Sequence, residues 1–207
     1  MTNDAADITR VPDMSALRAV VVYESMYGHT REVAERVADG LRSEFAQVDV
    51  VPVMEAAVEV SADLVVVGGP THVHGMSRPQ TRQAAVDDPT RYGRGAPAEP
   101  GAAGMGLREW FDHLRQGSGP AAAFDSRAPG PAALTGRASK GIAKRLDQHG
   151  FTLVGGLQSF LVTSEPGLPR GEGDKAERWG RELATAARSS ADPRPLLTKP
   201  DVSVASC

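Results

Sequence analysis

The sequence predicts an α/β protein whose core is a doubly wound parallel sheet. Residues 19–22 and 64–67 are short, continuously apolar runs, of the kind found in strands that are buried on both faces. Apolar residues recur at helical spacing between and after such runs, so that strand and helix alternate along the chain. This alternation is typical of a parallel sheet that carries helices on both of its faces.

The first strand leads almost directly into a helix. The apolar face of that helix is formed by Val33, Ala34, Val37, Ala38 and Leu41. A second β-rich segment then carries valines at positions 48, 50, 51 and 53. Residues 54–61 are expected to form a short helical connection from this segment to the third strand at residues 64–67.

Later segments continue the same alternation. One helical face precedes the fourth strand, expected at residues 120–124, and another, closed by Gly150, precedes the fifth strand, expected at residues 151–162. Gly155 and Gly156 interrupt the fifth strand, and a last helical face follows it. The three faces comprise Leu107, Trp110, Phe111 and Leu114; Ala138, Ile142 and Leu146; and Ala176, Trp179, Leu183 and Ala187. Both tryptophans are therefore expected to anchor the core.

The turn after the first strand has the composition of a phosphate-binding loop. It consists of Ser25, Met26, Tyr27, Gly28, His29 and Thr30. A helix begins here, so its unpaired amide groups and the positive end of its dipole face the loop, and two hydroxyls add further donors. The Gly-Lys-Ser/Thr ending of a Walker loop is absent, and a Rossmann fingerprint needs three glycines where this loop has one. A plain helix-capping turn without a ligand is the alternative.

Four residues of this region match a more specific signature. An apolar strand ends in the aromatic Tyr23, and Ser25, Gly28 and Thr30 follow at fixed spacing. On this motif the chain resembles the flavodoxin family. The resemblance implies a flavodoxin-like three-layer sandwich with a five-stranded parallel sheet in the order 2-1-3-4-5. It also implies that the loop holds the 5′-phosphate of FMN.

A second candidate loop follows the strand at residues 64–67. It consists of Pro70, Thr71, His72, Val73, His74 and Gly75. Ligands of open α/β sheets lie at the carboxyl ends of the strands where the strand order reverses, and in the flavodoxin order that point falls between the first and third strands. The resemblance implies that a flat side chain, here His72, lies against the flavin ring and that a neighbouring peptide contacts the flavin N5. Gly75 is expected to let that peptide rotate.

The spacing of His72 and His74 also suggests a metal site. Zinc needs four ligands, and the one cysteine of the chain, Cys207, is terminal. Exposed loop histidines or the flavin edge are therefore the favoured interpretations, and no metal is expected.

A third contact loop is expected after the fourth strand, at Asp125, Ser126 and Arg127. The resemblance implies that these residues lie beside the isoalloxazine ring, and a solvated Asp–Arg pair is the alternative. Arg78 and Arg82 would share one face of a helix near the same site. They would meet the flavin, a dinucleotide phosphate or an acidic partner, although a solvated helix start is the favoured interpretation.

One domain is expected over residues 18–188. Residues 1–17 and 189–207 are polar or contain proline without sustained periodicity, so both segments are expected to be mobile. Residues 87–106 are rich in Gly, Pro, Ala and charge and are too long for an ordinary connector, which indicates a surface insertion or lid. This segment is either a gate for a substrate or partner, or a disordered loop without a role.

Composition limits the classes of function. The net charge of −3 disfavours a nucleic-acid surface, and it is mild for a strongly acidic electron carrier that docks on basic partners. We find neither an apolar run of about 18 residues nor a charged-then-apolar leader, so we expect no membrane span and a cytoplasmic protein. A single cysteine excludes an internal disulfide.

The expected function is electron transfer through bound FMN, to a redox partner protein or to a small-molecule electron acceptor. No catalytic acid, base or nucleophile from the protein is required, because the cofactor carries the redox chemistry. One alternative is an FMN-dependent reductase that takes hydride from NAD(P)H and passes it to a quinone-type acceptor. The other is a flavodoxin-fold binding or regulatory module without flavin.

Overall fold

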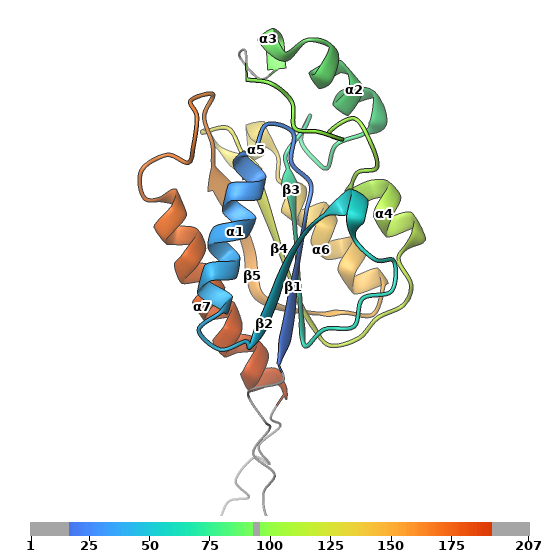
Figure 1. Cartoon of the computed structure of the whole chain (residues 1–207), viewed down its shortest axis with the longest axis vertical. Coiled ribbons are helices and arrows are strands. Elements are labelled where there is room, and N and C mark those ends of the chain that lie inside the picture. Colours follow the sequence, from blue (N-terminus) through green and yellow to red (C-terminus); the bar gives the residue numbers. More distant parts are fainter. Residues whose placement is uncertain (1–16, 93–95, 192–207) are drawn as a thin grey trace, which may run out of the picture.

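A computed structural model describes residues 17–92 and 96–191 (Figure 1). Its centre is a five-stranded sheet in the order β2-β1-β3-β4-β5, and every neighbouring pair of strands is parallel. The strands are β1 (Arg18–Tyr23), β2 (Gln47–Pro52), β3 (Leu64–Pro70), β4 (Pro120–Arg127) and β5 (Thr152–Leu161). The predicted fold class and strand order are therefore confirmed.

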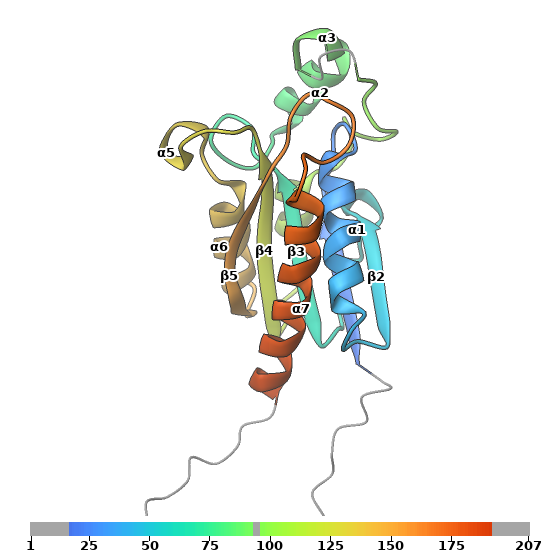
Figure 2. The same ribbon diagram turned by 90° about the vertical axis from the view of Figure 1, so that its left-hand side faces the viewer.

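Helices cover both faces of the sheet. Figures 1 and 2 show α1 (His29–Leu41) and α7 (Glu172–Ala191) on one face, and α4 (Leu107–His113) and α6 (Ala138–Gln148) on the other. Alternate residues of the central strands pack toward opposite faces, so Val21 and Val66 contact one hydrophobic cluster while Val20 and Val65 contact the other. Short elements complete the fold: η2 (Val53–Glu55), α2 (Pro79–Asp87), α3 (Pro89–Tyr92) and α5 (Ala132–Thr135).

The α1 and α7 helices approach each other at two glycines. A Cβ atom on Gly40 would overlap the carbonyl oxygen of Glu177, and one on Gly180 would overlap that of Val37. Because neither position has room for a side chain, these glycines set the spacing between the two helices.

The interruption predicted in the fifth strand is present as an irregularity of β5. Gly155 and Gly156 both have φ of +69°, a left-handed backbone conformation that glycine adopts without strain. The pairing of β5 with β4 shifts register at the same place, between Ala121 and Ala123. The Gly155 carbonyl accepts a hydrogen bond from the indole nitrogen of Trp179 at 3.3 Å.

Both tryptophans are core residues, as predicted. Trp110 and Trp179 are buried in opposite layers of the molecule, and the indole nitrogen of Trp110 donates to the carbonyl oxygen of Ala57 at 3.1 Å. Each ring therefore fills an apolar layer while its one polar group is satisfied by a backbone carbonyl.

Two expectations about element boundaries need correction. The segment 54–61 is not a helix beyond the single 3₁₀ turn of η2, because Ala56 already has an extended backbone. Strand β4 continues to Arg127, so the three residues predicted on a loop after it belong to the end of the strand. Helix α7 runs to Ala191, and the remaining terminal residues, 1–16 and 192–207, lie outside the described part of the chain.

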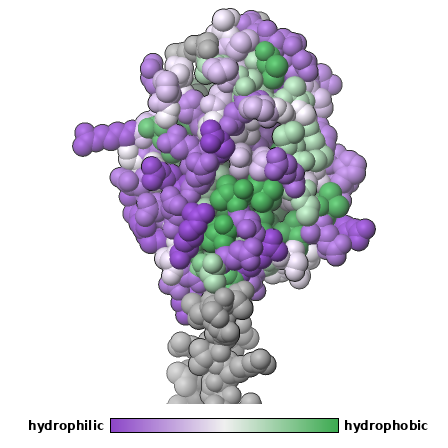
Figure 3. Space-filling view, viewed as in Figure 1, coloured by the Kyte–Doolittle hydropathy of each residue, from purple (hydrophilic) through white to green (hydrophobic). Residues whose placement is uncertain are grey.

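The sheet ends at β2 on one side, and its valines are only half-buried. Figure 3 shows apolar surface in the lower middle of this face. The helices described here do not combine the length and apolar character that crossing a membrane requires.

Candidate functional site

The 25–30 loop joins β1 to α1 at the carboxyl edge of the sheet. Gly28 is the residue before the helix and has φ of +92°, and its amide donates to the Ser25 hydroxyl at 3.1 Å. No residue of the described chain caps α1 with a side chain. The first amide groups of the helix therefore face the loop together with the positive end of the helix dipole, an arrangement that favours an anion.

Ser126, at the end of β4, connects all three predicted contact segments. Its hydroxyl lies 2.7 Å from the buried Thr30 hydroxyl, and its carbonyl accepts the amide of Thr71 at 2.8 Å. The Thr71 hydroxyl in turn accepts the amide of Ala138 at 2.9 Å. The structure therefore brings the 25–30 loop, the loop after β3 and the end of β4 into one network.

Asp125 and Arg127 do not form the solvated pair that was the alternative interpretation. The buried Asp125 carboxylate accepts the amide of Ser139 at 2.9 Å and so caps the start of α6. The Arg127 guanidinium points to the turn that follows β4, where it donates to Gly130 O at 2.8 Å and Thr135 Oγ1 at 3.1 Å. Asp125 thus ties the end of β4 to the start of α6, and Arg127 ties it to the turn after β4 and to α5.

Residues 72–75 form a tight turn after β3. The amide of His72 donates to Gly75 O at 2.7 Å, and the Gly75 amide donates back to His72 O at 3.0 Å. Val73 and His74, the central residues, have φ of +44° and +71°, as in a type I′ turn. A β-branched residue rarely adopts this conformation, and the Val73 side chain is 83% exposed. Backbone strain of this kind concentrates at functional sites.

His72, the first residue of this turn, is half-buried. Burial lowers the pKa of its imidazole below the ordinary value of 6.5; the Glu24 carboxylate opposes this shift, and Arg82 adds to it. The ring is therefore neutral at pH 7. Its buried Nδ1 atom has no hydrogen-bond partner among the described residues.

Arg82 is an interior residue, so the solvated interpretation was wrong for it. Only 2% exposed, its guanidinium donates to Gly104 O, Ser77 Oγ and Glu109 Oε2, each at 3.0 Å. Arg78 is exposed, as a solvated helix start predicts. The arginine pair is therefore divided between the core and the solvent.

Glu24, which directly follows β1, belongs to the same buried region. Its Oε2 atom accepts the amide of Leu107 at 2.9 Å, while Oε1 has no partner in the described part of the chain. A Cβ atom placed on Gly106 would lie 2.8 Å from Glu24 Oε2 and would also touch the Arg82 guanidinium, so carboxylate and guanidinium are close neighbours. The sequence analysis missed Glu24, although an acidic residue between a buried strand and a candidate ligand loop was a signal for it.

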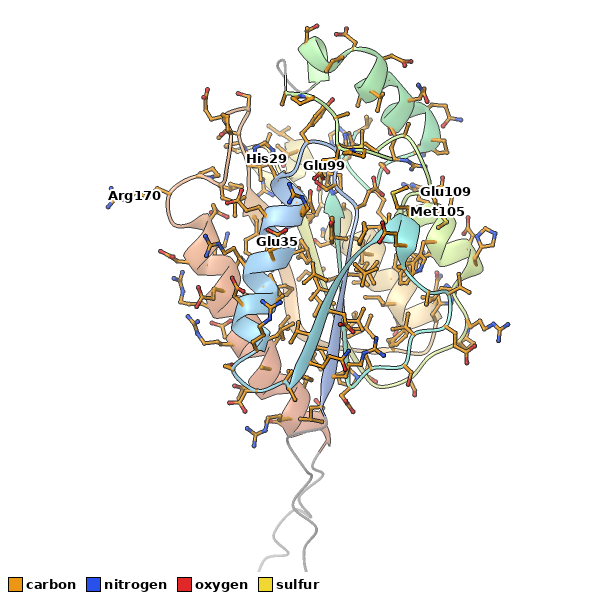
Figure 4. The ribbon with its side chains drawn as sticks, viewed as in Figure 1. His29, Glu35, Glu99, Met105, Glu109 and Arg170 are labelled. Atoms are coloured by element: carbon orange, nitrogen blue, oxygen red, sulfur yellow. The ribbon has the colours of Figure 1, made fainter. Side chains whose placement is uncertain are left out.

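The predicted insertion, residues 87–106, contacts the 25–30 loop. The amide of Glu99 donates to Met26 O at 2.8 Å, and its carboxylate accepts Arg31 Nε at 2.7 Å. Figure 4 shows Glu99 beside the start of α1, and a Cβ atom built on Gly28 would lie 3.9 Å from its Oε1 atom. Burial, followed by the charge of Glu99, raises the pKa of Tyr23. This segment therefore places a carboxylate beside the predicted phosphate loop, which no local pattern in the sequence indicated.

A cavity of about 660 Å³ opens beside the loop. Its lining includes Gly28, His29 and Arg31 as well as Ala96, Pro97 and Gly167 from two other segments. The His29 imidazole lies within hydrogen-bond distance, 2.9 Å, of the carbonyl of Glu165, in the segment that follows β5. The described residues contain no group of three or more His, Cys, Asp or Glu side chains placed to hold a metal ion.

The fold and the site together define a class of protein. An all-parallel sheet in the order 2-1-3-4-5 has its reversal of strand order between β1 and β3, and the uncapped start of α1 lies at this point. This is the architecture of a flavodoxin-like α/β protein, with a helix start that favours an anion at the carboxyl edge of the sheet.

Comparison with known proteins identifies the family. The profile of the flavodoxin family matches residues 21–186, so the chain belongs to the flavodoxin family. At the level of the family, this membership supports flavin binding and electron transfer. A comparison with curated protein sequences found no match.

Solved structures of similar fold include several flavodoxins. An archaeal flavodoxin is 19% identical, with a TM-score of 0.56 over 83% of this chain and 99% of that chain. Flavodoxin 1 from Bacillus cereus is 17% identical, with a TM-score of 0.57 over 81% and 97% of the two chains. A flavodoxin, WrbA-like protein from Agrobacterium tumefaciens is 22% identical, with a TM-score of 0.52 over 84% and 99%. At these identities the likeness shows the fold alone.

Proposed function

We propose that this protein binds FMN, with the 5′-phosphate in the 25–30 loop, and transfers electrons through it. The observation that carries the proposal is the start of α1, where amide groups without a side-chain cap follow Gly28 at φ of +92°. The Ser25 hydroxyl accepts the Gly28 amide in this loop, and the Thr30 hydroxyl lies against the Ser126 hydroxyl in the first turn of the helix. Family membership supports the same ligand class.

The residues present fit the phosphate end of FMN. A Cβ atom built on Gly28 would be in ordinary contact with Arg31 Nη2 at 3.6 Å and Glu99 Oε1 at 3.9 Å, so a guanidinium and a carboxylate flank the loop at this glycine. Arg31 adds a positive charge at the same place, although Glu99 engages it. Amide donors, a hydroxyl and a guanidinium are the groups that hold phosphate in proteins.

The residues at the end of β3 fit the flavin ring. His72 offers a neutral, flat imidazole, and its buried Nδ1 atom lacks a partner within the described chain, as expected of an atom that meets a ligand. The strained turn at Val73 and His74 lies directly beside it. The involvement of residues 70–75 and 125–127 in holding the ring remains a prediction.

When bound, FMN supplies the redox chemistry. The chain binds and orients it, excludes water from it and sets the charge around it. The Glu99 carboxylate beside the phosphate loop weakens FMN binding in this proposal, because like charges repel. The donor, the acceptor and a cytoplasmic location are predictions that await experiment.

Binding is tested with FMN-free protein, titrated with FMN and followed by flavin absorbance and fluorescence. Ser25→Asp keeps an acceptor for the Gly28 amide but adds negative charge to the loop. It is expected to weaken FMN binding at least about tenfold. Ser118→Asp adds the same charge on an exposed loop and is the matched control.

Wild type that leaves the absorbance and fluorescence of added FMN unchanged would overturn the proposal and favour the flavin-free binding module. Equal FMN affinities of wild type and Ser25→Asp would show that the phosphate does not bind in this loop. With FMN bound, steady-state consumption of NAD(P)H favours the reductase. Reduction only through a separate reductase protein favours the electron carrier.

A further inference from the structure

A second cavity, of about 830 Å³, lies between the loop after β3 and helix α6. Five cationic residues line it: Arg108, Arg137, Lys140, Lys144 and Arg145. No Asp or Glu of the described residues is among its lining. Figure 2 shows α5 and the start of α6 beside the loop that follows β3. We call this cavity the basic cleft.

Most of these cations have no acidic partner. Lys140 and Lys144 are exposed and form no ion pair with any residue that the structure describes. Arg137 donates to the neutral Ser159 hydroxyl at 3.2 Å, and Arg108 donates to Ser77 O at 2.8 Å. Arg145 alone is neutralised, by Asp112 at 3.0 Å. A chain with a net charge of −3 thus concentrates unpaired positive charge in one concave site.

The arrangement does not stabilise the helix that carries it. Lys140 and Lys144 are four residues apart on α6, where like charges repel. Arg137 and Lys140 stand at the start of α6, where the helix dipole disfavours cations but the buried Asp125 carboxylate already accepts the Ser139 amide. A bound anion would relieve the repulsion between the two lysines.

The shape of the site favours a small molecule over a protein surface. Its volume falls within the range of small-molecule sites, about 300–1,000 Å³. The cations come from α4, from α6 and from the residue before α6, so they can contact phosphate groups from several sides. His74 and Gly75 form another part of the wall, and they belong to the turn that follows the predicted flavin contact His72.

We propose that the basic cleft binds a soluble nucleotide that carries a pyrophosphate, of the nicotinamide dinucleotide class. The pyrophosphate contacts Arg137, Lys140 and Lys144, and the remainder of the nucleotide extends toward His74. The choice of a nicotinamide nucleotide rests on the proposed function, because only a flavin at the end of β3 gives such a nucleotide a redox partner. The cleft itself does not overlap the 25–30 loop.

The test is calorimetric titration of the protein, with and without FMN, with NADP⁺, ADP and adenosine. NADP⁺ and ADP are expected to bind, adenosine is expected to bind at least about tenfold more weakly, and inorganic pyrophosphate is expected to displace NADP⁺. The double variant Lys140→Glu, Lys144→Glu should weaken NADP⁺ binding at least about tenfold. Arg170→Glu is the control, since Figure 4 shows Arg170 pointing away from the molecule on the other side of the sheet.

Three results would overturn the inference: no binding of NADP⁺ or ADP, equal loss in the double variant and in Arg170→Glu, or binding of polyglutamate but not of nucleotides. The last result would favour an acidic protein partner. FMN titration of the same variants separates the two proposals, because the double variant should bind FMN as wild type does. A protein that binds NADP⁺ but not FMN would retain the cleft as a nucleotide site and refute the flavin proposal.

Discussion

Replacing Arg82 by methionine is expected to destabilise the protein by about 3 kcal/mol. Removing one partner from a buried ion pair costs about 3–5 kcal/mol, because the other charge stays buried without compensation. Arg82 is 2% exposed, but its partner Glu109 is 29% exposed and regains some water in the variant, which places the cost near the lower limit. The two further hydrogen bonds of the guanidinium, to Gly104 O and Ser77 Oγ, are lost as well.

The pair between Arg115 and Glu59 provides a matched control. It joins the same two residue types at the same 3.0 Å, but its side chains are 70% and 72% exposed. Arg115→Met is expected to cost less than about 1 kcal/mol, as exposed ion pairs do. The comparison measures what burial and the two further hydrogen bonds of Arg82 add to an ion pair.

Urea unfolding followed by circular dichroism measures both variants. In thermal unfolding, Arg82→Met should lower Tm by about 6–12 °C, given about 2–4 °C per kcal/mol for a domain of this size. Equal losses for Arg82→Met and Arg115→Met would refute the reasoning.

Three further predictions concern other parts of the molecule. Gly180→Ala should destabilise the protein by more than about 2 kcal/mol, because the added Cβ atom would overlap the Val37 carbonyl. Gly173→Ala in the same helix is the control: its Cβ atom would meet no atom closer than 3.7 Å, so this variant should be as stable as wild type or more stable. Equal unfolding midpoints for the two variants would contradict this. Glu99→Gln should tighten FMN binding about two- to tenfold by flavin fluorescence titration, and weaker binding would show that the carboxylate supports the site. Burial lowers the folded-state pKa of His72, so the unfolded chain binds more protons than the folded chain below pH 6.5. The free energy of unfolding should therefore decrease as the pH falls below 6.5, and it should decrease less in His72→Gln. Unfolding measured at several pH values tests this, and equal decreases in both proteins would contradict it.

Local pattern was sufficient to predict most of the fold. Apolar runs such as residues 19–22 and 64–67 specify buried strands wherever they occur, and the spacing of Val33, Val37 and Leu41 specifies a helix face without reference to the rest of the chain. The segment 54–61 has no such periodicity, and its irregular course depends on contacts with residues far away in the sequence. One of these contacts is the hydrogen bond from the Trp110 indole nitrogen to the Ala57 carbonyl oxygen.

The candidate site was predictable where its chemistry is contiguous in sequence. Ser25, Gly28 and Thr30 lie in one turn, and their placement at the start of α1 agrees with the motif. The pairs Arg82–Glu109, Arg31–Glu99 and Glu24–Leu107 are 27, 68 and 83 residues apart in the sequence. Charged side chains at such separations look solvated in isolation, and only the assembled fold buries them or pairs them.

The most direct test of the account compares FMN with riboflavin, which lacks the phosphate. Two or more charge-assisted hydrogen bonds from the 25–30 loop to the phosphate should make FMN bind at least about 100-fold more tightly. Titration of FMN-free protein with each ligand, followed by quenching of flavin fluorescence, measures the ratio. A large preference for FMN that Ser25→Asp abolishes is the predicted result, and equal affinities for the two flavins would contradict the account.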